Sequence, residues 1–172
     1  MYQAGEQIVY GDLGVCSVVE VAQREMPGME GKRWYYTLEP RFEYQLRIYA
    51  PADNPKVRMR PVVTRAQAQR LLDGLPSLRT AARSEEPEAL VAGLEKSLAL
   101  EGCSDLIELA LFACAPRQLT PEYRRRIGLA DRTAAKQGQQ RLLQELSVAL
   151  ELPAASVREA LDRRPAAPAA CS

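Results

Sequence analysis

The sequence has no histidine, which removes the commonest general base and the commonest metal-binding side chain at once. Its four cysteines show no CxxC spacing, so the paired-thiol pattern of zinc and redox sites is missing too. The chain also has no glycine-rich phosphate loop and no nucleophile elbow. We therefore predict that it is not an enzyme and that it holds no cofactor and no metal ion.

Long hydrophobic runs are also missing. The longest apolar stretch, Leu106 to Ala115, contains Glu108 and is too short to span a bilayer, which indicates a buried helix. No signal-peptide pattern is present, and Cys16 and Cys114 lie in apolar runs where small hydrophobic residues belong. These features predict a cytoplasmic protein with reduced thiols and no membrane contact.

Aromatic residues make up only 6% of the chain, and they are unevenly distributed. Most lie in the first fifty residues, after which only Phe112 and Tyr123 remain and Ala and Leu become abundant. Aromatic and β-branched residues favour strands, whereas Ala and Leu favour helices. The composition therefore predicts an α+β fold with a β part followed by an α part.

The first sixty residues predict four or five short strands. Turn signals rich in Gly and Pro separate strands expected at 6–10, 14–22, 33–38 and 44–50, and residues 57–60 fit a short fifth strand. The run Trp34–Tyr36 fits core or cross-strand pairs better than a surface that stacks nucleobases. Closing such a sheet removes most exposed edges, so we predict a small SH3- or Tudor-like β-barrel over residues 1–62.

Residues 63–164 predict an all-helical domain. Thr64 and Gln67 form a capping box, and the helix that they begin is expected to end at Pro76. A second helix is expected after Ser84, ending at Gly102, and a third from Ser104 to Ala115.

A long helix is then expected from Thr120, which has Pro121 at its first helical position. Apolar or small residues recur every three or four positions from there to Leu146, which predicts one continuous helix. Pro153 breaks this run, and 157–161 fits a last short helix. The final residues, 165–172, are expected to form a disordered tail.

The net charge of +1 hides two segments of opposite sign. From Glu85 to Glu108 there are seven acids and one base, a balance of −6; from Arg117 to Arg141 there are seven bases and two acids, a balance of +5. The basic segment is a candidate for contact with DNA phosphates or, alternatively, a solvated face. The candidate DNA-contact residues are Arg124, Arg125, Arg126, Arg132 and Lys136.

The opening YQAGEQIVYGDLGVCSVVEV resembles the start of the CarD and CdnL proteins and of the polymerase-interacting domain of the transcription-repair coupling factor. Gly5, Val9, Tyr10 and Gly14 hold the family's positions, whereas Glu6, Gly11 and Leu13 replace its aspartate, proline and histidine. Further on, YYTLEP, LRIYAP and VRMR resemble family segments in the same order, and LTPEYRRR and LLQEL resemble its helical segments. The resemblance covers roughly residues 1–150.

The resemblance implies a bacterial transcription regulator whose barrel binds the β subunit of RNA polymerase by adding an edge strand to a strand of the partner. On the expected strand 44–50, Gln45, Arg47 and Tyr49 share one face, which we predict to meet polymerase. Arg24 lies where the family has a contact arginine. A second family arginine falls at Tyr49, with Arg47 two residues earlier on the same face.

The helical half departs from the family, which places a tryptophan wedge near the start of a long helix at the upstream edge of the melted promoter. Here Glu85 or Glu86 stands at that place, and the only tryptophan, Trp34, belongs to a strand. The leading hypothesis is a monomeric polymerase-binding regulator that modulates open-complex formation beside promoter DNA. The alternatives are a polymerase-binding paralogue without DNA contact and a KOW-like RNA-binding module.

Overall fold

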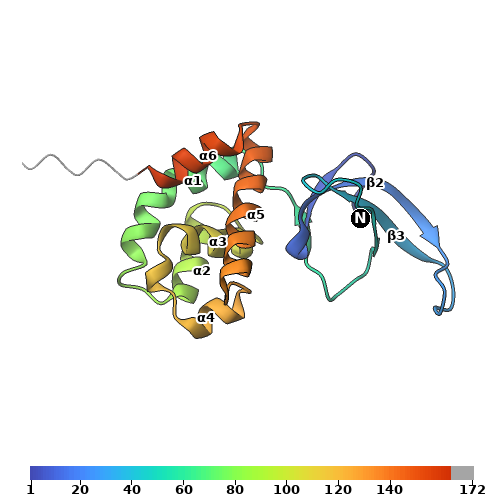
Figure 1. The fold of residues 1–172 in the computed structure, drawn as a ribbon, viewed down its shortest axis with the longest axis horizontal. Helices are drawn as coiled ribbons and strands as arrows, with labels where there is room; N and C mark the ends of the chain where they lie inside the picture. Colours follow the sequence, from blue (N-terminus) through green and yellow to red (C-terminus); the bar gives the residue numbers. More distant parts are fainter. Residues whose placement is uncertain (164–172) are drawn as a thin grey trace, which may run out of the picture. The chain divides into compact units, whose positions relative to one another are not determined.

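The computed structural model describes residues 1–163, so the predicted tail 165–172 lies outside the described residues. The chain divides into two compact units, Met1–Val62 and a second unit that begins at Val63 (Figure 1). The described part of the first unit is built from strands and the described part of the second from helices. The predicted α+β class is confirmed.

The first unit is a five-stranded antiparallel sheet in the order β4-β3-β2-β1-β5. A short 3-10 turn at Gly11–Leu13 joins the first two strands. Strands β4 and β5 form the two edges, and no pairing joins them among the described residues, so the sheet is open where a closed barrel was expected. The strands are β1 (Gln7–Tyr10), β2 (Gly14–Arg24), β3 (Arg33–Pro40), β4 (Ile48–Pro51) and β5 (Met59–Pro61).

A β-bulge in β2 decides which side chains face the core. Val18 pairs with Leu38 and Glu20 pairs with Thr37, so Val19 is an extra residue on β2. Before the bulge Val18 points into the core, and after it Val21 does. The bulge therefore moves the even-numbered residues of β2 from the inner face of the sheet to the outer face.

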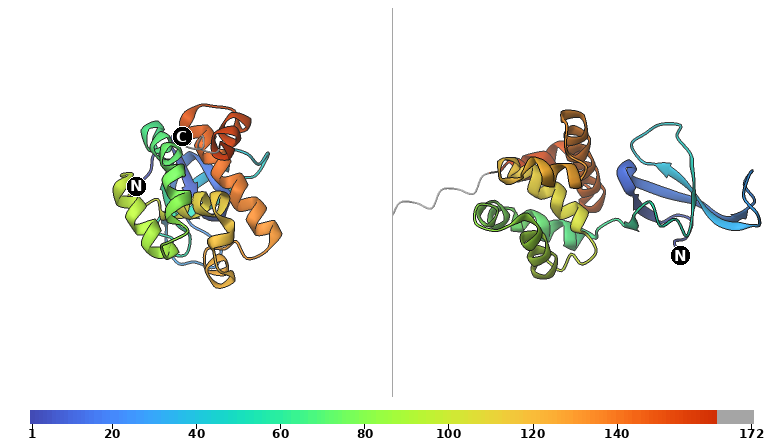
Figure 2. Two further views of the ribbon diagram at one scale, coloured as in Figure 1. Left: turned by 90° about the vertical axis from the view of Figure 1, so that its left-hand side faces the viewer. Right: turned by 90° about the horizontal axis from the view of Figure 1, so that it is seen from below.

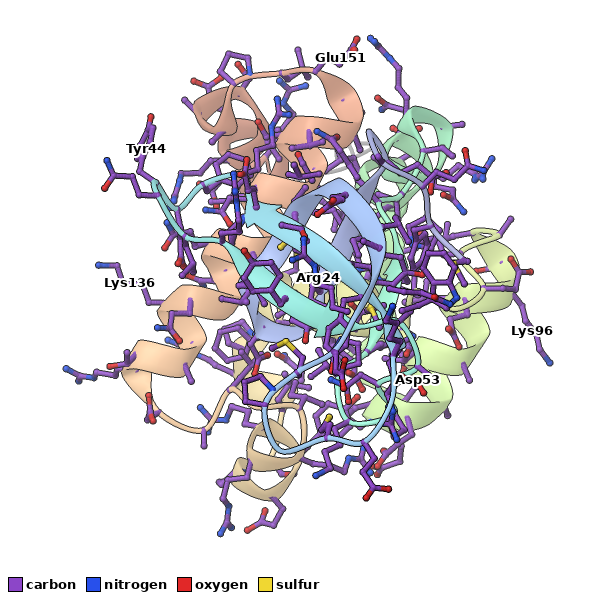
Figure 3. All side chains as sticks on the ribbon, turned by 90° about the vertical axis from the view of Figure 1, so that its right-hand side faces the viewer. Arg24, Tyr44, Asp53, Lys96, Lys136 and Glu151 are labelled. Atoms are coloured by element: carbon purple, nitrogen blue, oxygen red, sulfur yellow. The ribbon has the colours of Figure 1, made fainter. Side chains whose placement is uncertain are left out.

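The predicted strand 44–50 is too long at its start. Pairing with β3 begins at Ile48, and residues 41–47 form a turn instead. Gln45 has a φ of 63°, a left-handed conformation that an extended strand cannot contain. Tyr44, the first residue of that predicted strand, is 99% exposed and points into solvent (Figure 3).

The second unit is a bundle of six described α-helices around α3. Helix α3 contacts α1, α2, α5 and α6 (Figures 1 and 2). It has five buried residues, which confirms the buried helix predicted from the apolar stretch. The helices are α1 (Arg65–Ala81), α2 (Pro87–Ser97), α3 (Ser104–Cys114), α4 (Pro121–Arg126), α5 (Arg132–Leu150) and α6 (Ala154–Asp162), with a 3-10 turn at Pro116–Gln118.

The start of α1 was predicted correctly, but its end was not. Both hydrogen bonds of the capping box are present, from Gln67 N–H to Thr64 Oγ1 (3.2 Å) and from Thr64 N–H to Gln67 Oε1 (2.8 Å). Helix α1 continues through Pro76, because Leu75 and Leu78 are buried on either side of that exposed proline. Tertiary packing thus overrides the usual helix-breaking effect of proline.

Helix α2 begins later than predicted. Its N-cap is Glu86 with Pro87 as the first helical residue, and no side chain caps the helix. The hydroxyl of Ser84, the expected cap, instead donates to the Ala81 carbonyl at the end of α1 (3.3 Å). The helix also ends at Ser97, before the predicted stop at Gly102.

The predicted long helix from Thr120 to Leu146 is two helices. The Thr120 cap is confirmed, since its Oγ1 accepts the Tyr123 N–H (3.1 Å), but α4 ends at Arg126. Gly128 then takes a left-handed φ of 75°, and the Asp131 carboxylate caps α5 by accepting the Ala134 N–H (2.8 Å). The basic residues Arg124–Arg126 and Arg132–Lys136 therefore lie on different helices.

The buried thiol of Cys16 makes the stability of the first unit sensitive to alkaline pH. Burial raises the pKa of Cys16 from 9.0 to about 11. The unfolded chain therefore releases this proton first, and the free energy of unfolding falls as the pH rises from about 9 to about 11, by roughly 2–3 kcal/mol.

Trp34, the one tryptophan of the chain, lies in the first unit, so its fluorescence reports the unfolding of that unit. We expect urea titrations followed by this signal to show a steeper loss of stability between pH 8 and pH 10.5 for the wild type than for Cys16→Ala. The variant is less stable at neutral pH because it leaves a small cavity, and the difference from the wild type narrows as the pH rises. Equal pH dependence in the two proteins would contradict the prediction.

Candidate functional site

The edge strand β4 offers part of its backbone to a partner. The Ala52 N–H donates to the Trp34 carbonyl (2.9 Å). This bond shows which residues of β4 are hydrogen-bonded to β3 and which point the other way. Hydrogen-bonded positions alternate along an antiparallel pair, so Ile48 and Ala50 turn their backbone groups toward β3. The N–H and C=O of Tyr49 and the C=O of Pro51 therefore point away from the sheet.

The opposite edge, β5, is also short and also contains a proline. The Gly11 N–H donates to the Arg58 carbonyl (2.9 Å), so Arg60 faces β1 while Met59 and Pro61 face outward. Short edges with proline resist uncontrolled pairing between sheets. The two edges turn similar backbone groups outward. The side chains next to each edge therefore decide which one is the better candidate for binding a partner strand.

Beside β4, the outer face of the sheet carries a stacked cation. The Arg24 guanidinium lies over the Tyr49 ring, 4.9 Å from its centroid, and forms an ion pair with Glu20. Glu20 also accepts a hydrogen bond from the Thr37 hydroxyl (3.4 Å). Because Glu20, Thr37 and Tyr49 are in register across three strands, these side chains form one row that leads to the edge (Figure 3 labels Arg24).

Arg47 and Gln45, the other two predicted polymerase contacts, precede the strand. Arg47 donates to Glu39 Oε1 from both Nε (3.0 Å) and Nη2 (2.6 Å), and this hydrogen bonding raises the pKa of Arg47. Gln45 is exposed in the turn 41–47 and away from the strand face where it was expected. The structure thus brings Arg24 and Tyr49 into contact, whereas Arg47 binds Glu39 and Gln45 belongs to the turn.

The same turn presents three exposed apolar side chains. Phe42, Tyr44 and Leu46 are 42%, 99% and 39% exposed. They alternate with polar residues as in a strand, but Gln45 has a left-handed φ of 63°, which an extended strand cannot contain. No feature of the sequence marks that conformation.

Two of the candidate DNA-contact residues are bound to carboxylates within the second unit. Arg125 pairs with Glu122 (3.2 Å) and Arg126 with Glu88 (2.8 Å). Arg126 also lies over the Tyr123 ring, 4.6 Å from its centroid. A backbone hydrogen bond and the Arg126 contact lower the pKa of Glu88, so the carboxylate stays charged and keeps its partner.

Tyr123 ties this group to the core of the second unit. Its hydroxyl donates to Glu108 on α3 (3.1 Å), and burial raises the pKa of Tyr123. Helices α2, α3 and α4 are thereby connected through Glu88, Arg126, Tyr123 and Glu108. Arg126 therefore has a structural role, the connection of α4 to α2, in addition to any contact with a partner.

The remaining candidates differ in exposure. Arg124 is half-buried, and its Nε is enclosed without a partner within residues 1–163. Arg132 and Lys136 are exposed on α5, four residues apart and so on one helix face, and neither forms an ion pair with another described residue (Figure 3 shows Lys136). Glu85 and Glu86 are exposed just before α2.

Residues 1–163 contain neither a metal-ligand cluster nor a membrane-spanning helix. No group of three or more His, Cys, Asp or Glu side chains there could hold a metal ion. In the same range no helix is long and apolar enough to cross a membrane.

Comparison with known families gives one match and defines its extent. The family model described as the CarD-like/TRCF RID domain matches residues 2–63. No curated protein matches the chain. The matched segment covers the whole five-stranded sheet and ends where the second unit begins. The resemblance is confirmed over residues 2–63, whereas its extension to residue 150 stays a prediction: the first unit is a CarD-like/TRCF RID domain, which implies a transcription-related role that involves interaction with RNA polymerase.

Proposed function

We propose that this chain is a non-enzymatic bacterial transcription regulator. Its RID domain binds the β subunit of RNA polymerase through edge strand β4, and its helical unit modulates open-complex formation at promoters. One observation carries the proposal: the family-matched unit has an edge whose outward backbone groups at Tyr49 lie next to a stacked Arg24.

The geometry of β4 supports strand addition over a short length. Tyr49 contributes one donor and one acceptor, and Pro51 contributes one further acceptor. Backbone hydrogen bonds of this kind provide affinity without much sequence specificity. A ladder of about three bonds is too short to determine the partner, so the side chains beside it supply the selectivity.

Arg24 is well placed to provide that selectivity. Stacking on Tyr49 and pairing with Glu20 hold the guanidinium in one orientation, which reduces the entropy lost on binding. The Arg24 side chain is 35% exposed, so part of the guanidinium is accessible although its Nε is enclosed. We expect the polymerase strand to place a carboxylate next to Arg24, because Arg binds carboxylates with directed hydrogen bonds.

For the helical unit, the arrangement of charges favours α5 as the surface that meets DNA. Arg132 and Lys136 share one exposed face of that helix and have no carboxylate partner within residues 1–163. Arg125 and Arg126 already bind Glu122 and Glu88. Phosphate contact therefore costs less at α5 than at α4, where an internal ion pair must first be broken.

A second candidate function is polymerase binding without DNA contact. The exposed carboxylates of Glu85, Glu86 and Glu88 lie at the start of α2. The CarD and CdnL proteins, which the sequence resembles, have their tryptophan wedge near this place. Carboxylates are repelled by phosphate, so this end of the unit is unsuited to a duplex. On this reading the helical unit meets another protein.

The first test replaces the donor at the edge. In Tyr49→Pro the outward N–H is lost, while the bonds from β4 to β3 through Ile48 and Ala50 are kept. We expect the affinity of the full chain for core RNA polymerase to fall about tenfold or more, from the lost hydrogen bond and the lost contact with Arg24. Biolayer interferometry with immobilised polymerase measures the change.

Tyr49→Val serves as the matched control, because it removes the ring but keeps the N–H. Its affinity should lie between those of the wild type and Tyr49→Pro. Circular dichroism and Trp34 fluorescence establish that each variant is folded. Equal binding by all three proteins would show that β4 is not the docking edge, and a pull-down that returned ribosomal particles in place of polymerase would favour an RNA-binding module.

The second test compares two matched pairs of neutralised cations. We expect Arg132→Gln/Lys136→Gln to weaken binding of the full chain to promoter DNA and to reduce the slope of log K against log salt by about 2. Arg125→Gln/Arg126→Gln should change the slope less, because these cations are already paired. The lifetime of open complexes, followed with a competitor, should respond to the first pair only.

If neither pair changes DNA binding or open-complex lifetime while polymerase affinity is unchanged, the helical unit makes no functional contact with DNA through these residues. That outcome would support the polymerase-binding paralogue.

A further inference from the structure

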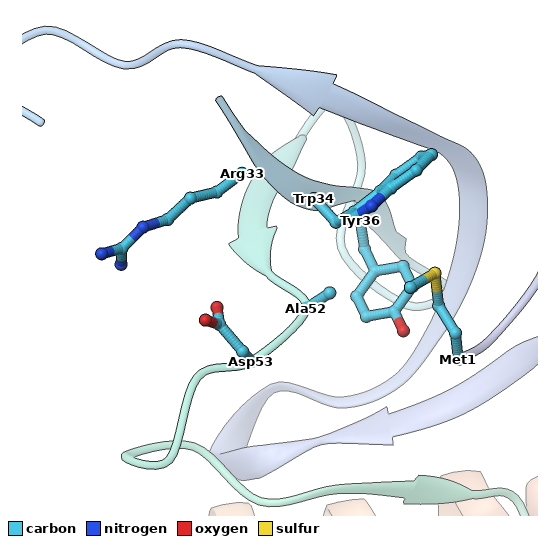
Figure 4. Close-up of a pocket in the computed structure, with 6 residues that line it drawn as sticks. All are labelled: Met1, Arg33, Trp34, Tyr36, Ala52 and Asp53. Atoms are coloured by element: carbon cyan, nitrogen blue, oxygen red, sulfur yellow. The ribbon is translucent and has the colours of Figure 1, made fainter. Parts of the chain in front are cut away.

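The first unit contains a pocket directly after edge strand β4. Its volume is about 430 Å³, and its lining comes from the chain start, β3 and the segment after β4: Met1, Arg33, Trp34, Tyr36, Ala52 and Asp53 (Figure 4). The Ala52 N–H bonds to the Trp34 carbonyl (2.9 Å), so the pocket adjoins the last position at which β4 and β3 are connected.

One side of the pocket is apolar and uncovered. Trp34 is 43% exposed and Met1 is 80% exposed, although Trp34 lies on the core face of β3 with the buried Tyr36. The Tyr36 hydroxyl accepts the Tyr2 N–H (3.1 Å), which fixes the ring at the floor. In Figure 4 these three side chains gather on one side of the opening. An exposed tryptophan face is favourable to bury.

The other side of the pocket is charged but has no net charge. Arg33 and Asp53 turn their charged ends toward the same opening (Figure 4), and neither side chain forms a hydrogen bond or ion pair with another residue in 1–163. Any single ion that entered would be attracted by one of them and repelled by the other. A neutral dipolar group satisfies both, and a peptide group fits because Arg33 can donate to its C=O while Asp53 accepts from its N–H.

Pro51 explains why a partner strand would reach this pocket. The outward hydrogen bonds of β4 end there, since Pro51 offers a carbonyl but no N–H. A strand that pairs with Tyr49 must therefore leave the edge near Ala52 and Asp53, which line the pocket. Side chains of such a strand alternate between the two faces of the sheet, so one of them is directed to the core face on which Trp34 lies.

We propose that this pocket receives one apolar side chain of the polymerase strand that pairs with β4, and that Arg33 and Asp53 bind a peptide group of the same strand. The inference rests on the proposed function and deepens it. The RID domain would then hold its partner on both faces of the sheet, through Arg24 on the outer face and through Trp34 on the core face.

The test uses Trp34 as its own reporter, because it is the one tryptophan in the chain. The full chain is produced with 5-hydroxytryptophan, which is excited at wavelengths where the tryptophans of polymerase barely absorb. Core RNA polymerase is added until size-exclusion chromatography shows a complete complex. We expect quenching of the Trp34 signal by acrylamide to fall several-fold in the complex.

Variants test the energetic role of the same residue. Trp34→Ala should weaken polymerase binding about tenfold or more, as expected for a tryptophan in a docking pocket, and Trp34→Phe should recover most of the affinity. Asp53→Lys, which makes the rim doubly positive, should weaken binding several-fold. Leu152→Ala, in the second unit, changes a side chain with the same 43% exposure and should leave affinity unaltered.

The outcomes separate the two proposals. A complex that forms with unchanged Trp34 quenching, or a Trp34→Ala variant that is folded and binds like the wild type, overturns the pocket assignment and leaves the proposed function in place. Failure of the wild type to form any complex with polymerase overturns the proposed function and the pocket assignment with it.

Discussion

The extra residue Val19 in β2 is the local feature on which the first unit depends. In a regular strand, Glu20 and Arg24 would follow Cys16 and Val18 onto the core face, and burying charged groups there would be costly. The bulge places Val21 in the core opposite Tyr36 and turns Arg24 outward, where it reaches Tyr49. One backbone irregularity thus provides both a dry core and the charged row that leads to edge β4.

An exposed edge is both a binding surface and an aggregation hazard, and the two edges of this sheet limit the hazard in the same way. Strands β4 and β5 have four and three residues, and each ends in a proline. On each of these strands, a single residue turns both its N–H and its C=O outward. A partner must therefore add side-chain contacts to the few backbone bonds, which makes selective pairing possible where extended sheet-to-sheet pairing is not.

Two helix caps with local signals were predicted from the sequence, whereas features set by distant contacts or by backbone conformation were not. The capping residues Thr64 and Thr120 act within one helical turn and were predicted correctly. Pro76 remains helical because of leucines that pack against other helices, and Gln45 has a left-handed backbone in the turn where a strand was predicted. The sequence pattern contains neither fact. Arg24 and Tyr49 entered as site candidates through family resemblance, whereas the Trp34–Asp53 pocket required the pairing of β3 with β4.

The two units handle their cations differently, and this difference bears on how the functions divide. In the RID domain Arg24 is stacked on Tyr49 and paired with Glu20 on the outer face of the sheet, so a partner can reach it without opening the core. In the helical unit Arg126 is tied through Tyr123 to α3, so recruiting it would disturb the packing of α2 and α4. Among the cations predicted to contact DNA, Arg132 and Lys136 of α5 are the exposed pair with no ion pair within residues 1–163, so phosphate contact would cost least there.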